Sequence, residues 1–410
     1  MLFEDVPLVS TNKLGAFFDS QLIAHHYGDL TRSRVRCVKV ESDMWLVAGH
    51  PCQAVEKCFV DNGATEGFQA IVRADVDGVV RQYVRLTSPS ASDQPIVEVC
   101  IKGKMNPITG KLIENPDEII EDIAKLCERV LRFPLFREQC NLRGLRIAGS
   151  VYEARSLRSY VNEIIQSCGA EWLGDNAVFY PPVEGYAVPV EAASITTHVA
   201  MTDVAGVLSV FYGWNHSQER NGNFIELTAK GCQYTNKGAI YARWLRSPRD
   251  AEALARRVLG KRAGEFVKVT ATIEEKIRAG TVIDLPDRNF PGRMLVLAAT
   301  PTEVNTQVEG EIVLSVYPNL LVTQYSTENL SVRSERIDVL INLEKMEAVI
   351  SIFDQQNRPM EGVKVTYDGS ITKVTGVTGV VTFAVSKGNH TLLLEGKRIS
   401  SSEPYPLLIP

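Results

Sequence analysis

The chain has 410 residues, 45% of them hydrophobic, so it is long enough for several domains that each bury an ordinary core. Its 44 basic and 49 acidic residues leave a formal charge of -5, which provides no global basic field for nucleic acid or an anionic membrane. The start of the sequence lacks the basic and apolar regions of a secretory signal, and no apolar run reaches the roughly 18 residues that span a bilayer. We therefore expect a soluble globular protein made in the cytosol, without a membrane span and without nucleic-acid recognition.

The first hundred residues have the pattern of a β-meander. Asn62-Gly63 and Asp77-Gly78 supply the positive φ angles that tight hairpins require, so we expect a turn at each. The turn at 75–78 could also be a calcium loop, but the residues after it lack the oxygen ligands and the final glutamate of an EF-hand, which favours a hairpin. The β-rich runs are 35–40, 44–49, 54–60, 68–74 and 79–86.

The cysteines give little support for a metal site. They are scattered without a CxxC pair, whereas structural zinc usually takes ligands in close pairs, because a tight turn must point two of them at one ion. The nearest approach is His50 and Cys52 with Cys58, and buried thiols on strands are the better interpretation. Because no cysteine follows Cys232, we expect no disulfide framework in the C-terminal part.

Three segments, at 115–131, 156–168 and 247–262, carry the start and stop signals of helices. Asn115 and Ser247 are suited to be N-caps. The prolines that follow them, Pro116 and Pro248, fit the first helical position. Gly169 can end the second helix in the left-handed conformation. Apolar residues at helical spacing give each segment one buried stripe.

Short strand-like runs make up most of the remaining sequence. They are too many and too short for a doubly wound sheet, in which helices alternate with strands, so a β-barrel or sandwich with a few helices fits better. From about Glu344, alternating runs divided by turn signals predict a separate Ig-like sandwich. The earlier runs are 177–183, 195–201, 207–214, 224–229, 266–273, 281–285, 294–300 and 311–317.

Common catalytic signatures are missing from the sequence. It contains no Gly-x-Ser-x-Gly elbow, no pair of histidines one helical turn apart, no phosphate loop and no GxGxxG motif after a strand. We therefore expect no catalytic residue, no metal and no cofactor.

The densest acidic stretch is 114–122, which a lysozyme-like mechanism could use if one carboxyl lay in an apolar pocket. At helical spacing Glu118, Glu121 and Asp122 share a face opposite the apolar stripe, so we expect them to face water. Asp117 and Glu118 fall in the first turn, where negative charge suits the helix dipole and Glu118 can close a capping box. We interpret the stretch as the acidic start of a helix.

One polar turn, at 214–223, is a candidate binding loop. It lies between two strand-like runs and combines an aromatic base with a polar tip, so it could contact a partner or a glycan. A hairpin loop needs no function, and this alternative stays open. The candidate contact residues are Trp214, Asn215, His216, Arg220 and Asn223.

Four stretches, taken in order, resemble one protein family. They are AHHYGDL (24–30) followed by 36–63, TGKLIENPDEIIEDIAKL (109–126), SLRSYVNEIIQSCGAEWLGDNAVFYP (156–181) and SPRDAEALARRVLG with its continuation to 285 (247–285). Together they resemble the hub and tail-tip proteins of tailed bacteriophages, the group related to baseplate hub proteins of contractile tails. One departure is Thr281, which follows Gly280 where an aspartate is usual in that family. The resemblance covers roughly 20–320, and the order of the motifs carries it.

The resemblance implies an α+β fold, mainly β, with two hub-type β-barrel domains, a small helical insertion and a C-terminal Ig-like sandwich. Hubs of this family form a threefold ring in which paired barrels give near-sixfold symmetry toward the tail tube. The segment from 344 resembles a carboxypeptidase-regulatory or bacterial Ig-like domain, which implies surface attachment. The expected domains are 1–108 (first barrel), 109–190 (α+β connector), 191–335 (second barrel, with helix 247–262) and 344–410 (Ig-like).

The function implied is structural. We expect a non-enzymatic virion protein at the tail tip or baseplate, assembled in the host cytoplasm as a homo-oligomer, with a trimer implied. Its partners would be a tail-tube or distal tail protein, spike or fibre proteins and, through the C-terminal domain, a host surface glycan. Two alternatives stay open: a tail-associated cell-wall-degrading enzyme and a free-standing glycan-binding adhesin.

Overall fold

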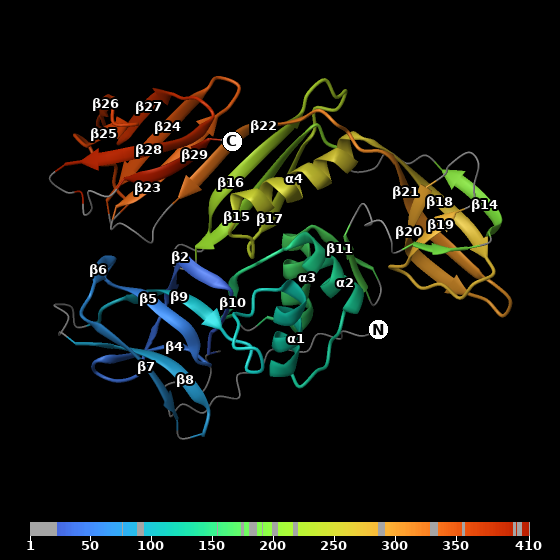
Figure 1. The fold of residues 1–410 in the computed structure, drawn as a ribbon, viewed down its shortest axis with the longest axis horizontal. Coiled ribbons are helices and arrows are strands. Elements are labelled where there is room, and N and C mark those ends of the chain that lie inside the picture. Colours follow the sequence, from blue (N-terminus) through green and yellow to red (C-terminus); the bar gives the residue numbers. More distant parts are fainter. Residues whose placement is uncertain are drawn as a thin grey trace.

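The computed structural model describes residues 23–75, 77–87, 94–153, 155–173, 176–179, 187–190, 192–198, 204–215, 220–285, 292–328, 335–354, 357–396, 399 and 404–409. Within these residues the chain forms seven sheets and four helices. The protein is therefore α+β and mainly β, as predicted. Figure 1 shows the blue N-terminal strands beside the helices α1–α3, α4 in the middle, a green, yellow and orange sheet at one end and the red C-terminal strands at the other.

Two four-stranded sheets form the N-terminal unit. They bury a common core in which Trp45 and Val84 of one sheet pack with Val99 of the other. Burial of such apolar surface contributes roughly 25 cal/mol per Å² to folding. In sheet order the strands are β2 (Asp29–Arg36), β9 (Val97–Lys104), β5 (Cys52–Val60) and β6 (Gly63–Thr65), and then β3 (Val38–Lys39), β4 (Met44–Ala48), β8 (Val80–Leu86) and β7 (Phe68–Ala74).

Both predicted hairpins of this unit are present, with one change in a turn. β7 pairs antiparallel with β8, and Gly78 between them has a φ of 77°. β5 pairs with β6 across Asp61 and Asn62, whose φ angles are 48° and 70°. Gly63 was predicted to be a turn residue, but it begins β6 instead. Aspartate and asparagine tolerate the left-handed region because their short side chains hydrogen-bond locally.

A helical group follows the N-terminal unit. α1 (Pro116–Leu126) begins where predicted, and the Asn115 side chain accepts a hydrogen bond from the Asp117 backbone N–H at 3.0 Å. The helix ends before the predicted limit at Leu131. α2 (Pro134–Arg143) was not predicted; Pro134 occupies its first position, but its N-cap residue, Phe133, makes no side-chain capping bond, so the cap signal is missing.

The other two helices lie within about a residue of their predicted ranges. α3 (Leu157–Cys168) starts at Ser156, whose hydroxyl accepts the Ser159 N–H, and it ends at Gly169, which has a φ of 68°. α4 (Pro248–Ala263) starts at Ser247. Short two-stranded sheets complete this region: β1 (His25–Tyr27) with β10 (Gly149–Val151), and β11 (Ala170–Leu173) with β12 (Asn176–Phe179).

A seven-stranded sheet joins the middle of the chain to its C-terminal part. The β22–β23 ladder, in which Tyr325 lies opposite Ile341, carries backbone hydrogen bonding across the join. The boundary predicted near 344 therefore falls inside this sheet, between β23 and β24. The strands in order are β17 (Lys237–Ala242), β15 (Val207–Asn215), β16 (Arg220–Ala229), β22 (Leu320–Glu328), β23 (Arg336–Asn342), β24 (Glu347–Phe353) and β27 (Val380–Ala384).

The C-terminal strands form a second layer against the end of that sheet. Ile350 and Phe383 of the seven-stranded sheet share one core with Leu392 of the facing layer. The same core continues through α1, α3, α4 and the middle strands, so helices and C-terminal sandwich are one packed body. The facing layer consists of β26 (Ile371–Val374), β25 (Lys364–Tyr367), β28 (Gly388–Glu395) and β29 (Tyr405–Ile409).

A six-stranded sheet, coloured green, yellow and orange at one end of Figure 1, has a core of its own. Ile195 on the edge strand β14 and Ile283 on β19, near the other edge, pack into this same core, so the sheet curls around it. The range 191–335, predicted to be one barrel domain, contains strands of both this sheet and the seven-stranded one. The order is β13 (Ala187–Pro189), β19 (Val282–Leu285), β20 (Gly292–Pro301), β21 (Thr306–Ser315), β18 (Glu265–Ile273) and β14 (Ala192–His198).

Ile350→Ala is expected to destabilise the whole body formed by the continuous core. Ile350 is fully buried, so the substitution should cost about 2–5 kcal/mol in transfer and cavity energy. Leu340→Ala on the neighbouring strand is the control, because Leu340 is 37% exposed and should lose less than about 1 kcal/mol. Urea unfolding followed by tryptophan fluorescence measures both, and all four tryptophans lie before residue 245. If Ile350→Ala leaves the urea transition of the tryptophan fluorescence unchanged, the C-terminal sandwich unfolds independently of the rest of the chain.

Candidate functional site

The structure places the predicted binding loop at one end of the β15–β16 hairpin. Trp214 and Asn215 end β15, while Arg220 and Asn223 lie on β16, with Asn215 opposite Arg220 in the register. Asn215 is buried, at 4% exposure. His216 lies outside the described residues. The described base of the loop is therefore part of the sheet.

Trp214 contacts parts of the chain that lie far apart in sequence. Its indole Nε1 donates to the Tyr152 hydroxyl at 3.3 Å, and the Arg243 guanidinium lies 3.5 Å from the centre of a Trp214 ring. Its backbone carbonyl accepts hydrogen bonds from Arg246 Nη1 at 2.6 Å and Ser33 Oγ at 3.1 Å. Ser33 belongs to the N-terminal unit, so Trp214 ties that unit to the middle sheet.

Glu163 on α3 extends these contacts. Its carboxylate lies 2.7 Å from Arg155 and 3.4 Å from Arg243, and it accepts a hydrogen bond from Trp244 Nε1 at 3.1 Å. We call Ser33, Tyr152, Arg155, Glu163, Trp214, Arg243, Trp244 and Arg246 the Trp214 joint. The joint connects β2, α3 and β15 through polar contacts that are largely shielded from water.

Three histidines lie where the N-terminal unit attaches to the helical group: His26 and His50 are buried, and His25 is partly buried. His50 Nε2 accepts the His26 backbone N–H at 3.0 Å, so its Nδ1 carries the proton and donates to the Pro51 carbonyl at 2.9 Å. His26 Nε2 faces the Val47 carbonyl at 3.0 Å and Nδ1 lies 2.6 Å from the Ser150 hydroxyl. These contacts satisfy a neutral imidazole, and they leave His50 no free ring nitrogen for the zinc considered from the sequence.

Burial keeps all three histidines neutral. It lowers the pKa of His25 to about 3 and that of His26 to about 4, and it places the pKa of His50 well below the usual range. The nearby thiols are also uncharged, because burial raises the pKa of Cys52 and of Cys58 to about 12. This region is consequently suited to packing rather than to acid–base chemistry near neutral pH.

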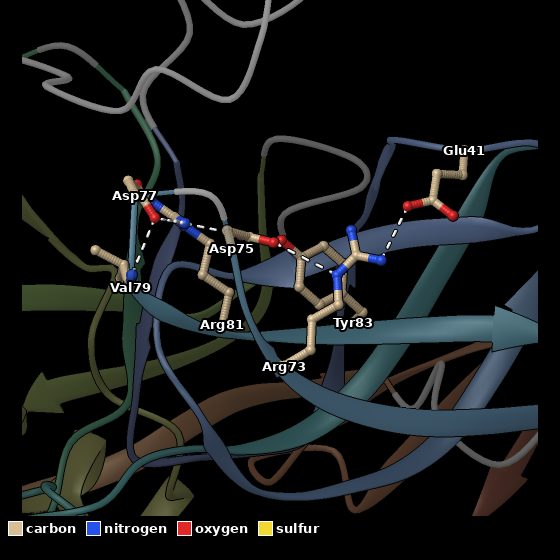
Figure 2. A network of polar contacts seen from close by, with 7 residues as sticks. All are labelled: Glu41, Arg73, Asp75, Asp77, Val79, Arg81 and Tyr83. Atoms are coloured by element: carbon tan, nitrogen blue, oxygen red, sulfur yellow. Dashed lines mark hydrogen bonds and ion pairs between the residues drawn. The ribbon is translucent and has the colours of Figure 1, made fainter.

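The β7–β8 hairpin tip holds a second polar network, shown in Figure 2. Arg81, which is almost fully buried, donates to Asp75 and Asp77, each at 2.7 Å. The hydrogen bond from Arg81 is the main reason that the pKa of Asp77 is lowered to about 2. The Tyr83 hydroxyl also donates to Asp75. The guanidinium thus occupies the place that a calcium ion would need between the two carboxylates.

The acidic stretch of α1 is also neutralised by partners. Asp117 is buried and faces Arg137 at 2.5 Å, and Arg137 also holds Glu121 at 2.7 Å. Asp122 lies 2.7 Å from Lys104 and accepts the Tyr27 hydroxyl at 2.8 Å. The expectation that Glu121 and Asp122 face water was wrong, because cations from neighbouring segments cover that side of the helix.

Neither a metal-binding group nor a membrane-spanning helix is present in the described part of the chain. No three of its histidine, cysteine, aspartate and glutamate side chains are grouped so that they could hold a metal ion. No helix among the described residues is long and apolar enough to cross a membrane.

Comparisons with known proteins gave only distant structural likenesses. No family model matches the sequence, and no curated protein matches it. Among solved structures, a chain of the virion of a native gene transfer agent particle has 11% identity and a TM-score of 0.46, covering 72% of this chain and 85% of that one.

Two tail proteins have lower scores. The 43 kDa tail protein of prophage MuSo2 from Shewanella oneidensis has 7% identity and a TM-score of 0.30, covering 71% of this chain and 94% of that one. The tail protein from Neisseria meningitidis MC58 has 9% identity and a TM-score of 0.31, covering 71% and 96%. Likenesses of this size establish neither family nor function.

Acidification is expected to destabilise the protein well above the range in which carboxylates titrate. The unfolded histidines bind protons with a pKa near 6.5, whereas the folded ones resist protonation down to about 3 or 4. Stability is therefore complete above about pH 6.5 and falls below it, by up to about 1.4 kcal/mol per pH unit for each histidine. Urea unfolding between about pH 7.5 and pH 5.5 measures the slope. His26→Gln should make it shallower, and a flat profile in the unaltered protein would contradict the histidine assignment.

Glu163→Gln is expected to weaken the Trp214 joint. The amide oxygen can still accept from Trp244, but Arg155 and Arg243 lose their shared negative partner, so we expect a cost of about 1.5–3 kcal/mol. Glu252→Gln is the matched control, since its pair with Arg256 is a helical i,i+4 pair at the surface worth about 0.3–0.5 kcal/mol. Urea midpoints compare the two. Equal losses would show that the joint contributes no more than a surface ion pair.

Proposed function

We propose that this chain is a structural protein of a phage tail, a hub or tail-tip component that forms a ring between the tail tube and the spike or fibre apparatus. One observation carries the proposal. The four stretches that resemble hub proteins supply β1, α1, α3 and α4, and these elements meet around the continuous core. The sequence signal of the family therefore falls on the elements that hold the parts of the molecule together.

The polar clusters fit a structural role better than a catalytic one. In the β7–β8 tip, Arg81 faces Asp75 and Asp77, and along α1 Asp117, Glu121 and Asp122 face cations; in the Trp214 joint Glu163 pairs with Arg155 and Arg243, while Arg246 donates to backbone carbonyls. A catalytic acid or base usually keeps a perturbed pKa in an accessible cleft. These groups are instead used to fix segments against one another, as a protein that transmits force would need.

The proposed ring would form through free strand edges and exposed apolar residues. β7 is an edge strand of its sheet, and its hairpin exposes Val72 by 52% and Val80 by 42%. Assembly would make the protein a homo-oligomer, with a trimer as the state that the resemblance implies. The C-terminal sandwich, projecting from the ring, would reach fibre proteins or a host glycan.

Direct imaging of purified virions with an antibody to this chain tests the proposal. Label at the tail tip is expected, and label confined to the capsid, or absent from virions, would refute it. Light scattering on the free protein adds the oligomeric state. A protein that stays monomeric alone and in every tail intermediate would exclude the ring.

Val80→Lys is expected to weaken assembly without unfolding the chain. It places a charge on the exposed hairpin, where a neighbouring subunit would otherwise cover apolar surface, and about a tenfold loss of association corresponds to 1.4 kcal/mol. Val377→Lys is the control, because Val377 is 74% exposed and lies in the C-terminal sandwich. Sedimentation analysis of both variants measures assembly, and an unaffected Val80→Lys ring would exclude this hairpin as an interface.

Two other functions make different predictions. A cell-wall-degrading enzyme would clear peptidoglycan in a zymogram and lose that activity on Glu118→Gln. A free-standing adhesin would be a monomer that binds sugars through the 214–223 loop, so Asn223→Ala should abolish binding on a glycan array. Either result would replace the hub proposal.

A further inference from the structure

A cleft of about 560 Å³ lies between α3, α4 and β17 at their contact with the six-stranded sheet. None of the residues that line it belongs to the Trp214 joint. Ile165, Ile240 and Phe266 give it an apolar wall and are themselves buried in the fold. Its volume is in the range of known ligand sites, roughly 300–1,000 Å³.

Arg257 brings a positive charge to this cleft. Its Nη2 donates to the Cys168 carbonyl at 2.6 Å, which fixes the guanidinium at the end of α3. Among the described residues no carboxylate pairs with it, and its Nε is buried without a hydrogen-bond acceptor. Burial, together with the nearby Arg143, lowers the pKa of Arg257 to about 10, so the group stays charged at neutral pH.

Gly169 allows Arg257 to take this position. A Cβ at residue 169 would lie 2.5 Å from Arg257 Nη2, and the φ of 68° is itself unfavourable for other residues. The end of α3 therefore leaves room for the guanidinium beside the cleft.

The carboxylates of the cleft are already engaged. Lys261 lies 2.7 Å from Glu311 and 3.4 Å from Glu171, so it neutralises both in part. Arg262 also lines the cleft, so three cations and two carboxylates give the lining one excess positive charge. Arg257 is partly buried with no carboxylate partner among the described residues, which is costly for a cation, and an incoming carboxylate would offset that cost.

Two amide side chains stand at the mouth of the cleft. Asn162 and Gln166 are exposed one helical turn apart on α3, and both line the cleft. Neither side chain makes a hydrogen bond to another described residue. An amide can donate and accept at once, which suits the backbone of an extended peptide.

We propose that this cleft binds an acidic peptide segment of a neighbouring protein. An acidic side chain would reach Arg257, its aliphatic neighbours would lie against the apolar wall beside the partly exposed Val258, and its backbone would pair with Asn162 and Gln166. The peptide would bridge the central body and the six-stranded sheet. This inference stands on the cleft itself and does not depend on the tail function.

Fluorescence anisotropy on the intact protein tests it. The probe is a fluorescein-labelled peptide, Ala-Leu-Asp-Leu-Ala, compared with its isostere Ala-Leu-Asn-Leu-Ala. We expect the aspartate peptide to bind about tenfold or more tightly than the asparagine peptide, and the difference to shrink with salt. Arg257→Gln should remove the preference. Arg249→Gln, an exposed position on the same helix, should keep it.

A second variant protects the test against misfolding, because Arg257 also caps α3. The double variant Asn162→Glu, Gln166→Glu changes only exposed positions and places negative charge at the mouth of the cleft. Its affinity for the aspartate peptide should fall by about tenfold. Its urea midpoint should stay close to that of the unaltered protein. Equal binding of the two peptides, no binding at all, or unchanged binding in the double variant would overturn the proposal. Hexanoate that binds and displaces the peptide at equal concentration would make this a small-acid site and overturn the peptide assignment.

Discussion

The carbonyl of Trp214 is the point at which the separate parts of this chain are tied together. Arg246 from the segment before α4 and Ser33 from the N-terminal unit both donate to it, and Arg246 Nε also donates to the Ala148 carbonyl at 3.0 Å. Because Arg246 is partly buried, its guanidinium is stabilised by the carbonyl acceptors that it reaches. The position of the N-terminal unit relative to the middle sheet is therefore constrained by the hydrogen bonds that converge on the Trp214 carbonyl.

His26 and His50 form a second set of buried polar contacts, in which the hydrogen-bonded groups are neutral. The His26 backbone N–H donates to His50 and the His26 ring contacts Ser150 and the Val47 carbonyl, so these polar groups at the attachment of β1 to β10 are matched without net charge. Neutral matched groups tolerate burial better than ions do, because they carry a smaller desolvation cost. Together with the paired acids of α1, these contacts hold neighbouring segments of the chain against one another.

The candidate site was only partly visible in the sequence. A Trp followed by polar residues between two strand-like runs located the base of the hairpin, because strand alternation and turn composition are local properties. What Trp214 contacts was not visible, since Ser33 and Tyr152 lie far away along the chain and reach it only through the fold. Arg257 gave no signal at all, because an arginine on the polar side of a helix pattern is ordinary until its neighbours are known.

The sequence by itself determined where helices begin and where left-handed turn residues lie. Asn115, Ser156 and Ser247 start helices where predicted, and Gly169 and Gly78 take the left-handed conformations predicted for them, because capping and turn geometry depend on a few adjacent residues. Tertiary structure alone decided that α2 forms, that one sheet runs from β17 to β27, and that Glu121 and Asp122 are covered by cations. These outcomes depend on strand pairing and on partners distant in sequence. Neither the periodicity nor the spacing of residues determines which distant segments pair or pack together.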